Sequence, residues 1–581
     1  MRSFFAHLPL QSALAKSAPA LAVACLLFSS TGQAQVVPSP GPQIGSSNTI
    51  SADPPVVRPR TRPCTVTLLH EQEFADFSNK SFNYVPPPEC PGPWSKVVLS
   101  ADFTVTAGRQ YDRTTQFYIG NANIFYGTTA EPRATLSPSW HIERDETDLS
   151  AIFKTAQPGQ AILGNLVNST YTGIIYANAE LQFYQASDDD HAPHVADLVV
   201  PLPNTPGGAV ALNTTANQLT QSVTLPANTE AAYLDVFAES QGGDEFWYTC
   251  VPSDVANELQ SCGNTGFRET EISIDGQAAG VAPVYPWIYT GGIDPYLWEP
   301  IPGVQTLNFK PFRVNLTPFA GLLADGKPHT VALSVFNANG YFLATANLLV
   351  FTDHRAQHVT GGVLQNTLAA APTPTVKENL ATDANGNITG TVAVGSQRNY
   401  LIRGWVQTSH GRVETTVEQK MHFRNTQQFD ITATDYVQDI AQQTTVDATT
   451  TTRGGFLNSR EQKHYSYPFS FNIDETFNPD STITEANVSD QKYLVDEQKH
   501  FEGFPVYRSE TANHVASQDT DLLVPVNGGY SIGSHSNQKS SQDYIFKDSF
   551  GHCYSRTLTA ANSVLIGVKD GAACRGWGLG W

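Results

Sequence analysis

The sequence predicts an all-β protein built from sandwich-like units, and three observations lead to that fold class. Thr, Asn, Gln, Gly and Pro are plentiful, and only 15% of the residues are charged, where about a quarter is usual. Apolar residues alternate with others in short runs, as in residues 97–105, which is the period of a half-buried strand. Gly, Asn, Asp and Pro separate these runs. Short strands at such spacing favour a sandwich or a jelly roll.

The N-terminus has the layout of a secretory signal peptide. Two basic residues accompany an apolar run over residues 18–28, and small residues follow as far as Ala34. The apolar run is too short for a stable membrane span. We therefore expect residues 1–34 to be removed and the protein to be secreted or periplasmic. Lipid attachment at Cys25 is the minor alternative.

Six cysteines remain after removal of the signal peptide, and an even number suggests disulfides in an exported chain. They form three local pairs along the sequence, and proximity is the only guide to their connectivity. The predicted pairs are Cys64–Cys90, Cys250–Cys262 and Cys553–Cys574.

Composition shifts divide the rest of the chain. Proline-rich and Ala/Thr/Pro/Gly-rich stretches are typical of linkers, and strand-like runs lie between them. In the second unit, Asp275-Gly276 favours a tight hairpin turn. The predicted order is a linker at 35–63, a first β unit at 64–200, a second at 201–355, a linker at 356–395 and a C-terminal β-rich domain of unknown role at 396–581.

The charge balance excludes some partners. Asp and Glu outnumber Lys and Arg by 54 to 34, which gives a formal net charge of -20 without a basic patch. Nucleic acid and anionic membranes are therefore not expected partners. His191 and His194 beside residues 188–190 are better explained as a solvated acidic loop than as a metal site, because no second ligand cluster accompanies them. We expect no metal and no cofactor.

The stretch Gly108–Gly120 contains the first candidate catalytic group. As an extended strand it places Asp112 on one face with Gln110 and Thr114, opposite the apolar side chains. On this pattern alone, a solvated surface charge is the commoner explanation of Asp112.

Carboxylates recur beside aromatic residues, which suggests a sugar site. The three clusters are Tyr111-Asp112, residues 245–248 and residues 294–299. Aromatic faces bind the apolar faces of sugar rings, and carboxylates accept hydrogen bonds from hydroxyls. For any single aromatic, a place in the core is the alternative.

These clusters belong to motifs that resemble the peptide:N-glycanase A family. The motifs run in order from about Cys64 to Asp353: residues 108–113, 128–132, 242–248, 266–269, 291–298 and 316–319. The resemblance implies an amidase that cuts the bond between an N-glycan and asparagine in N-glycosylated peptides or proteins. A more distant similarity to peptide:N-glycosidase F implies two adjacent jelly rolls with the site between them. We expect a monomer.

The resemblance also implies site residues. The catalytic aspartate of peptide:N-glycosidase F lies in a Trp-Asp-Arg sequence, which Tyr111-Asp112-Arg113 resembles, so Asp112 is the expected base. The glutamate of that enzyme falls near Asn264, which is not a carboxylate. Glu269 is the expected substitute, because in a strand it faces away from Ile272 and Ile274 and points into the same cleft. A plain surface glutamate is the alternative. The expected substrate-binding residues are Arg113, Glu131, Asp244, Glu245, Trp247, Asp294 and Trp298. Arg113 is also expected to support the architecture of the site.

Two other functions stay open at this level. A secreted glycan-binding or adhesion protein uses the same fold without catalysis. An endo-acting glycoside hydrolase also uses paired carboxylates, but it leaves a sugar on the asparagine.

Overall fold

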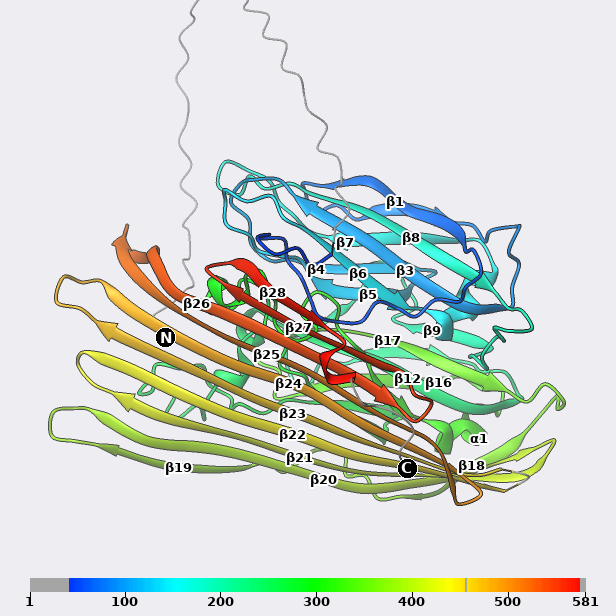
Figure 1. Ribbon diagram of the computed structural model, residues 1–581. Helices are drawn as coiled ribbons and strands as arrows, with labels where there is room; N and C mark the ends of the chain where they lie inside the picture. The colour runs from blue at the N-terminus through cyan, green and yellow to red at the C-terminus, as the bar shows by residue number, and fades with distance from the viewer. Residues whose placement is uncertain (1–40, 455–456, 575–581) are drawn as a thin grey trace, which may run out of the picture.

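The structure, a computed structural model, describes residues 41–454 and 457–574. It consists almost wholly of antiparallel strands, arranged as two small sandwiches against one large sheet (Figure 1). The predicted all-β class is confirmed. The predicted signal peptide lies outside the described residues. In the described part of the chain, no helix has the length and apolar character needed to cross a membrane.

The first sandwich is a jelly roll of eight strands. One sheet has the order β1-β8-β3-β6 and the other β2-β7-β4-β5, and stacked rings such as Phe103 against Trp140 fill the space between them. Its elements are β1 (Cys64–Phe74), β2 (Lys80–Tyr84), β3 (Trp94–Val105), β4 (Thr114–Ile119), β5 (Ala122–Thr128), β6 (Ser139–Asp145), the 3-10 helix η1 (Thr147–Lys154), β7 (Gln157–Leu163) and β8 (Ile175–Gln185).

The second sandwich repeats this topology. Its sheets have the orders β10-β17-β12-β15 and β11-β16-β13-β14, and β9 adds to β17. Its elements are β9 (Leu198–Leu202), β10 (Val210–Leu212), β11 (Leu219–Val223), β12 (Thr229–Gln241), η2 (Gly242–Asp244), η3 (Trp247–Thr249), β13 (Glu269–Ile274), β14 (Gln277–Pro283), η4 (Pro295–Trp298), β15 (Phe312–Asn315), η5 (Thr317–Phe319), α1 (Ala320–Leu323), β16 (His329–Phe336) and β17 (Tyr341–Thr352).

The Asp275-Gly276 turn joins β13 to β14 as expected. Both residues have positive φ angles, 50° and 78°, as a two-residue turn between twisted strands requires.

A single antiparallel sheet forms the C-terminal part of the chain. Along β21 buried and exposed residues alternate, so one face of the sheet is covered, and its apolar side chains share a continuous core with the second jelly roll. Its elements are β18 (Thr360–Asn366), β19 (Thr375–Thr382), β20 (Ile388–Thr408), β21 (Gly411–Ile431), β22 (Asp435–Gly454), β23 (Leu457–Phe477), β24 (Ile483–Phe501), β25 (Phe504–Val526), β26 (Gly529–Asp548), β27 (Cys553–Ala561), β28 (Val564–Asp570) and η6 (Ala572–Cys574).

Two predicted boundaries need correction. Residues 356–395 were expected to form a linker, but they contain β18, β19 and the start of β20. Their Thr, Gly and Asn content is typical of linkers, yet pairing with β20 satisfies their backbone groups. The second unit also begins earlier than residue 201, because β9 pairs with β17 from Leu198.

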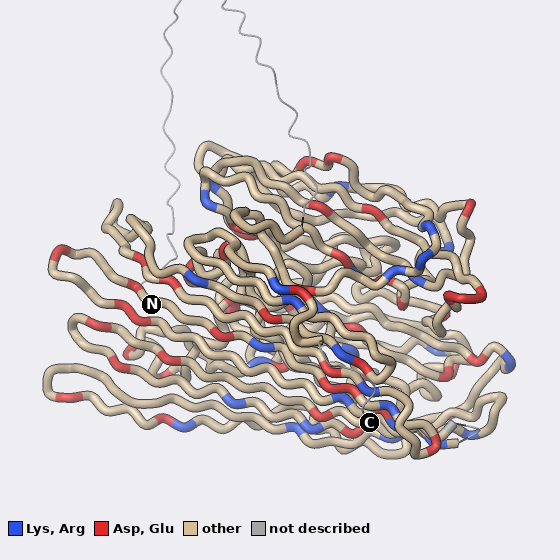
Figure 2. Tube along the Cα trace, in the orientation of Figure 1, with Lys and Arg blue, Asp and Glu red and all other residues tan. Residues whose placement is uncertain are grey.

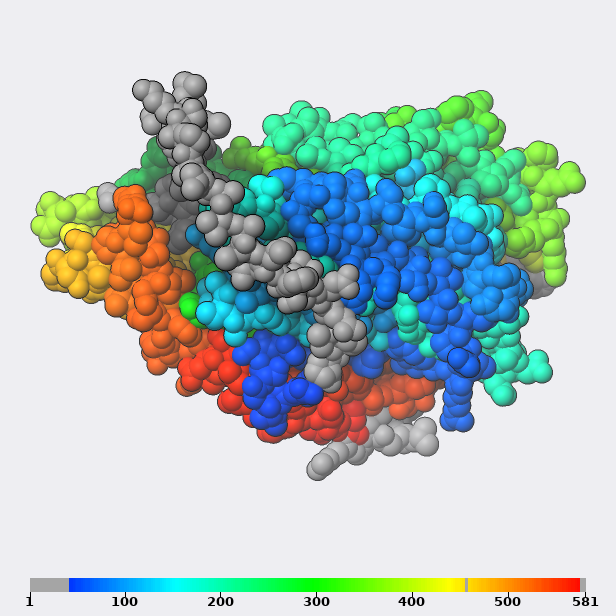
Figure 3. Space-filling model, turned by 90° about the horizontal axis from the view of Figure 1, so that it is seen from above, coloured from blue at the N-terminus to red at the C-terminus, as the bar shows by residue number. Residues whose placement is uncertain are grey.

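The expected N-terminal linker is extended but packed. In residues 41–63 the backbone of Gly45 bonds to Leu565 and that of Ile50 to Pro300, and Asp53 accepts a hydrogen bond from Asn513. Seen from above, this segment lies against the red strands beside the first jelly roll (Figure 3). It therefore connects the first jelly roll to the C-terminal sheet.

The structure contains the disulfides Cys64–Cys90, Cys250–Cys262 and Cys553–Cys574. Lys and Arg are spread among Asp and Glu along the described trace (Figure 2).

Candidate active site

Asp112 lies in the loop between β3 and β4, not within a strand as expected, because β4 begins at Thr114. Side chains and backbone groups of neighbouring loops bind the backbone of this loop. The Asp112 N–H donates to Glu131 Oε2 at 3.2 Å, and the Arg113 N–H donates to Thr129 Oγ1 at 2.9 Å. The loop therefore holds the half-buried Asp112 carboxylate at the edge of the first jelly roll.

Gly291 of the second jelly roll brings two carboxylates together. Its N–H donates to Asp112 Oδ2 at 2.8 Å. A Cβ atom on Gly291 would lie 1.9 Å from Glu131 Oε2 and 3.2 Å from Asp112 Oδ2, so only glycine leaves room for both. Asp112 and Glu131 thus lie close to each other at the meeting point of the two jelly rolls.

The environment gives these carboxylates different affinities for protons. Burial raises the pKa of Asp112, while the Gly291 N–H and the charge of Arg113 oppose that rise. Burial and the Asp112 charge raise the pKa of Glu131 to about 8. Two groups stabilise each anion, but the charges of Asp112 and Glu299 both raise the pKa of Glu131, so Glu131 keeps its proton near neutral pH and Asp112 ionises first.

The second jelly roll contributes two further carboxyl groups. Glu239, on β12, is buried and accepts hydrogen bonds from Tyr126 at 2.7 Å and Thr114 at 3.0 Å, which belong to the first jelly roll. Glu245 is half-buried, and burial together with the Asp112 charge raises its pKa to about 8. Glu239 joins the two jelly rolls beneath the site, and Glu245 is accessible beside it.

Arg113 and Tyr111 complete the site on the first jelly roll. The Arg113 guanidinium is buried at 6% exposure and lies against the Tyr111 ring. Its Nε and Nη2 are buried and have no hydrogen-bond partner among the described residues, so their N–H groups are left unsatisfied within the protein. Tyr111 is 37% exposed, and its ring packs edge-on against Tyr171. The site therefore presents an aromatic surface beside its charged groups.

Comparison with known proteins identifies the family. Residues 54–369 match the sequence profile of the peptide N-acetyl-β-D-glucosaminyl asparaginase amidase A family. The chain belongs to this family. It is an amidase that releases N-glycans from glycopeptides.

A curated relative of the amidase is peptide-N4-(N-acetyl-β-glucosaminyl)asparagine amidase A of Prunus dulcis, which is 31% identical over 394 residues, 64% of this chain and 67% of that protein. Among solved structures, PNGase F, a glycosylasparaginase from Flavobacterium meningosepticum, is 13% identical with a TM-score of 0.34 over 50% of this chain and 96% of that chain. PNGF-II is 13% identical with a TM-score of 0.35 over 52% and 67%.

Glu269 of the amidase does not lie beside Asp112, and its expected place in the cleft is corrected. It is fully buried in β13, and its carboxylate binds Arg398 of β20 at 2.6 Å. Alternation along the strand correctly turns Glu269 away from Ile272, but the C-terminal sheet covers that face of β13. Glu269 is therefore a structural residue.

Four other expected substrate residues are also buried away from solvent. Asp244 pairs with Arg268 at 2.8 Å. Trp247 is 0% exposed in the core, and Trp298 donates its Nε1–H to the Gly292 carbonyl. Asp294 faces the C-terminal sheet. In this structure none of the four reaches a substrate, because each is enclosed by its own unit or by the large sheet.

Of the expected site residues, Asp112, Arg113, Glu131 and Glu245 are brought together in the amidase. Sequence reasoning missed Gly291 and Tyr171, and it gave no role to Glu239. Gly291 belongs to the motif at residues 291–298, so the need for glycine at this position could have been inferred from the sequence. Glu239 is one position of an alternating strand, and none of its neighbours in the sequence marks it as part of a site.

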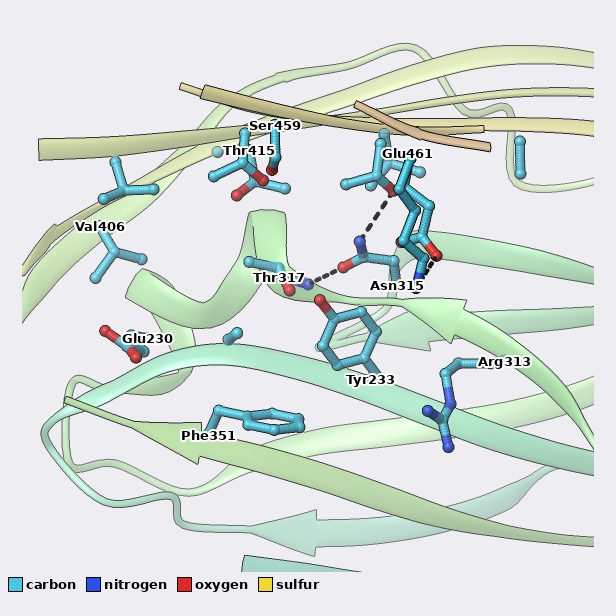
Figure 4. Close-up of a pocket in the computed structure, with 18 of the residues that line it drawn as sticks. Glu230, Tyr233, Arg313, Asn315, Thr317, Phe351, Val406, Thr415, Ser459 and Glu461 are labelled. Carbon is cyan, nitrogen blue, oxygen red and sulfur yellow. Dashed lines mark hydrogen bonds and ion pairs between the residues drawn. The ribbon is translucent and has the colours of Figure 1, made fainter. Parts of the chain in front are cut away.

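Two large cavities of the amidase lie away from Asp112 and Glu131. One of about 780 Å³ separates the second jelly roll from the C-terminal sheet, where Thr415 and Glu461 of the sheet face Tyr233 and Arg313 (Figure 4). Another of about 860 Å³ lies beneath residues 41–57. Neither is lined by Asp112 or Glu131. The carboxylate pair, not cavity size, therefore marks the site, because amide hydrolysis requires a base and an acid.

Proposed function

We propose that Asp112 is the base and Glu131 the acid that hydrolyse the amide joining the innermost N-acetylglucosamine to asparagine. The observation that supports this is the placement of two carboxyl groups with different proton affinities against one glycine N–H. A base and an acid at one point are what this reaction needs.

The reaction proceeds in two balanced steps. Ionised Asp112 takes a proton from water as the water oxygen bonds to the amide carbon, and the carbonyl oxygen becomes an oxyanion. Glu131 then gives its proton to the amide nitrogen, and the carbon–nitrogen bond breaks. The products are a peptide with aspartate in place of asparagine and a glycosylamine, which later loses ammonia.

Arg113 is the donor for the oxyanion. Its Nε and Nη2 are buried without hydrogen-bond partners in the described chain, and preorganised donors at the point where charge develops lower the barrier most. Removing one such donor typically slows the chemical step about 10²- to 10³-fold.

Tyr111 and Glu245 bind the sugar. The exposed Tyr111 ring provides a face for the apolar side of N-acetylglucosamine. Glu245, which keeps its proton near neutral pH, donates to or accepts from sugar hydroxyls. We assign no other residue to the sugar, because Trp247 and Trp298 are buried.

We extend the substrates to N-glycosylated proteins and place the enzyme outside the cytoplasm as a monomer. Tyr111 is exposed and Asp112 and Glu245 are half-buried, so the site is open to a glycan that a folded protein carries on its surface. Three disulfides are typical of an oxidising compartment.

The test is release of glycan from a glycopeptide by Asp112→Asn and Glu131→Gln, followed by mass spectrometry in heavy-oxygen water. Wild type is expected to leave labelled aspartate at the former asparagine. Asp112→Asn is expected to lose at least about 10³-fold in kcat, since it removes the base. Glu180→Gln, a carboxyl group on β8 outside the site, is the matched control.

Near-normal release by Asp112→Asn would contradict its role as the base. Loss of activity in Glu180→Gln to the same extent would show that the assay responds to the loss of any carboxyl group.

A further inference from the structure

A buried acidic cluster lies beyond the loop that carries Gly291. Asp294, three residues later, caps η4, which contacts β25 and β26 of the C-terminal sheet. One oxygen each from Asp294, Asp519 and Asp521 lies within 4.8 Å of the other two. These residues are only 1%, 2% and 2% exposed. Three carboxylates therefore converge where solvent does not separate them.

The cluster has too few hydrogen-bond donors for its oxygens. Both oxygens of Asp519 and Oδ1 of Asp521 are buried with no hydrogen-bond partner among the described residues. Nδ1 of His535 lies 3.5 Å from Asp519 Oδ1, but an imidazole is positive only when it is protonated. Asp294, by contrast, accepts from the Tyr296 N–H at 2.9 Å. Burying carboxylates without partners costs free energy. The cluster therefore requires a positive partner.

The strand register adds more oxygen donors to the same place. Asn487 of β24 is the cross-strand partner of Asp519, and Glu485 is the partner of Asp521. Asn487 Oδ1 is also buried without a partner, and its amide nitrogen lies 3.3 Å from Asp294 Oδ2. Oxygen ligands thus meet from the η4 loop and from two adjacent strands.

No Lys or Arg among the described residues forms an ion pair with these three carboxylates. Arg133, which lies near the cluster, is already paired with Glu299 at 2.9 Å. Three converging carboxylates whose buried oxygens lack donors bind either protons or a metal ion.

We propose that Asp294, Asp519 and Asp521 bind a divalent cation, and that this cation is Ca²⁺. All three ligands offer oxygen, which hard cations prefer. Ca²⁺ lies about 2.3–2.6 Å from its ligands, so oxygens bound to one ion are at most about 5 Å apart, and the cluster meets this limit. Mg²⁺ requires shorter bonds and keeps several waters, which a buried site accommodates poorly.

The ion attaches the active-site loop to the C-terminal sheet. Asp294 and Gly291 belong to one short loop, and Gly291 donates to Asp112. By neutralising the acidic cluster, the ion holds that loop on the side that faces the C-terminal sheet. This gives the C-terminal sheet a task that its own sequence does not reveal.

The test measures binding and stability, so it does not depend on the proposed catalytic roles. Chelator-treated full-length protein is titrated with CaCl₂ or MgCl₂ by calorimetry, and its Tm is measured with each salt and with EDTA. We expect one Ca²⁺ per chain and a Tm higher by about 3 °C or more with CaCl₂ than with EDTA. The double variant Asp519→Asn/Asp521→Asn is expected to lose both effects.

Two controls keep the outcome interpretable. Glu510→Gln, an exposed carboxyl group on the same strand β25, is expected to bind Ca²⁺ as wild type does. The Asn variants remove buried charge, so they are expected to fold at least as stably as the chelated wild type.

Equal Tm values in EDTA and CaCl₂ with no heat of binding would overturn the proposal and indicate that the carboxyl groups share protons instead. A larger effect of MgCl₂ than of CaCl₂ would overturn the choice of ion.

Discussion

Replacing Gly291 by alanine is expected to inactivate the enzyme without unfolding it. The new Cβ would lie 1.9 Å from Glu131 Oε2, and ordinary contact begins at 3.4 Å, so the carboxylate must move by about 1.5 Å. Misplacing a catalytic group by about 1 Å costs on the order of 10²-fold in rate. We therefore expect kcat/KM to fall by at least about 100-fold, which corresponds to about 2.7 kcal/mol.

The stability of this variant is expected to change little. Gly291 is not among the glycines with positive φ, so alanine fits its backbone, and the group that must move is the end of a flexible side chain. Gly362→Ala, on β18, is the matched control, since its Cβ would meet no atom within 4 Å. Glycan release and Tm are measured for both variants. Activity of a folded Gly291→Ala within a few-fold of wild type would refute the close approach of Glu131.

Four further predictions concern neighbouring groups. Glu269→Gln is expected to lower the free energy of unfolding by up to about 3–5 kcal/mol, because it leaves the buried Arg398 with only its longer ion pair to Glu271 at 3.5 Å; urea unfolding measures this, and unchanged stability would contradict it. The activity of the remaining folded fraction should be near normal, which separates Glu269 from the catalytic pair. Activity should fall as pH rises through about 8, where Glu131 loses its proton, and again at acidic pH as Asp112 gains one; a pH–rate profile without the alkaline fall would contradict the role of Glu131. Because the pKa of Glu131 is higher in the folded protein than in the unfolded chain, the stability it contributes is full at acidic pH and is lost as pH rises toward about 8; Tm measured across this range should fall less in Glu131→Gln. Tyr111→Ala is expected to raise KM about 5-fold with a smaller change in kcat, since stacking contributes about 1 kcal/mol to binding; a loss confined to kcat would contradict its role in binding.

Local patterns were enough to predict some of the strands and turns, but not the loop around Asp112 or the strands within residues 356–395. Alternation over residues 97–105 indicates β3, and Asp275-Gly276 indicates a hairpin, because both depend on neighbours in sequence. The grouping of Asp112 with Glu131 and Glu245 followed from the family motifs. No local pattern specifies that grouping, since Asp112 and Glu131 lie in two loops of the first jelly roll and Glu245 lies in a loop of the second.

The residues that sequence reasoning misplaced are those whose surroundings depend on long-range packing. Alternation in β13 gives the face of Glu269, but Arg398, which occupies that face, lies 129 residues later. An aromatic beside a carboxylate is equally compatible with a sugar site and with a core, and the core applies to Trp298 because η4 is enclosed between the second jelly roll and the large sheet.

The loop from Thr290 to Trp298 shows why the jelly rolls and the C-terminal sheet work as one unit. Thr290 donates to the Thr129 carbonyl of the first jelly roll at 2.8 Å, Gly291 donates to Asp112, and Asp294 faces β25. The apolar side chains of the second jelly roll also share one core with the sheet. A chain that ends at residue 355 would expose this core and release the loop that holds the base. The length of the family match, which ends near residue 369, is therefore not the length of the unit that positions the catalytic groups.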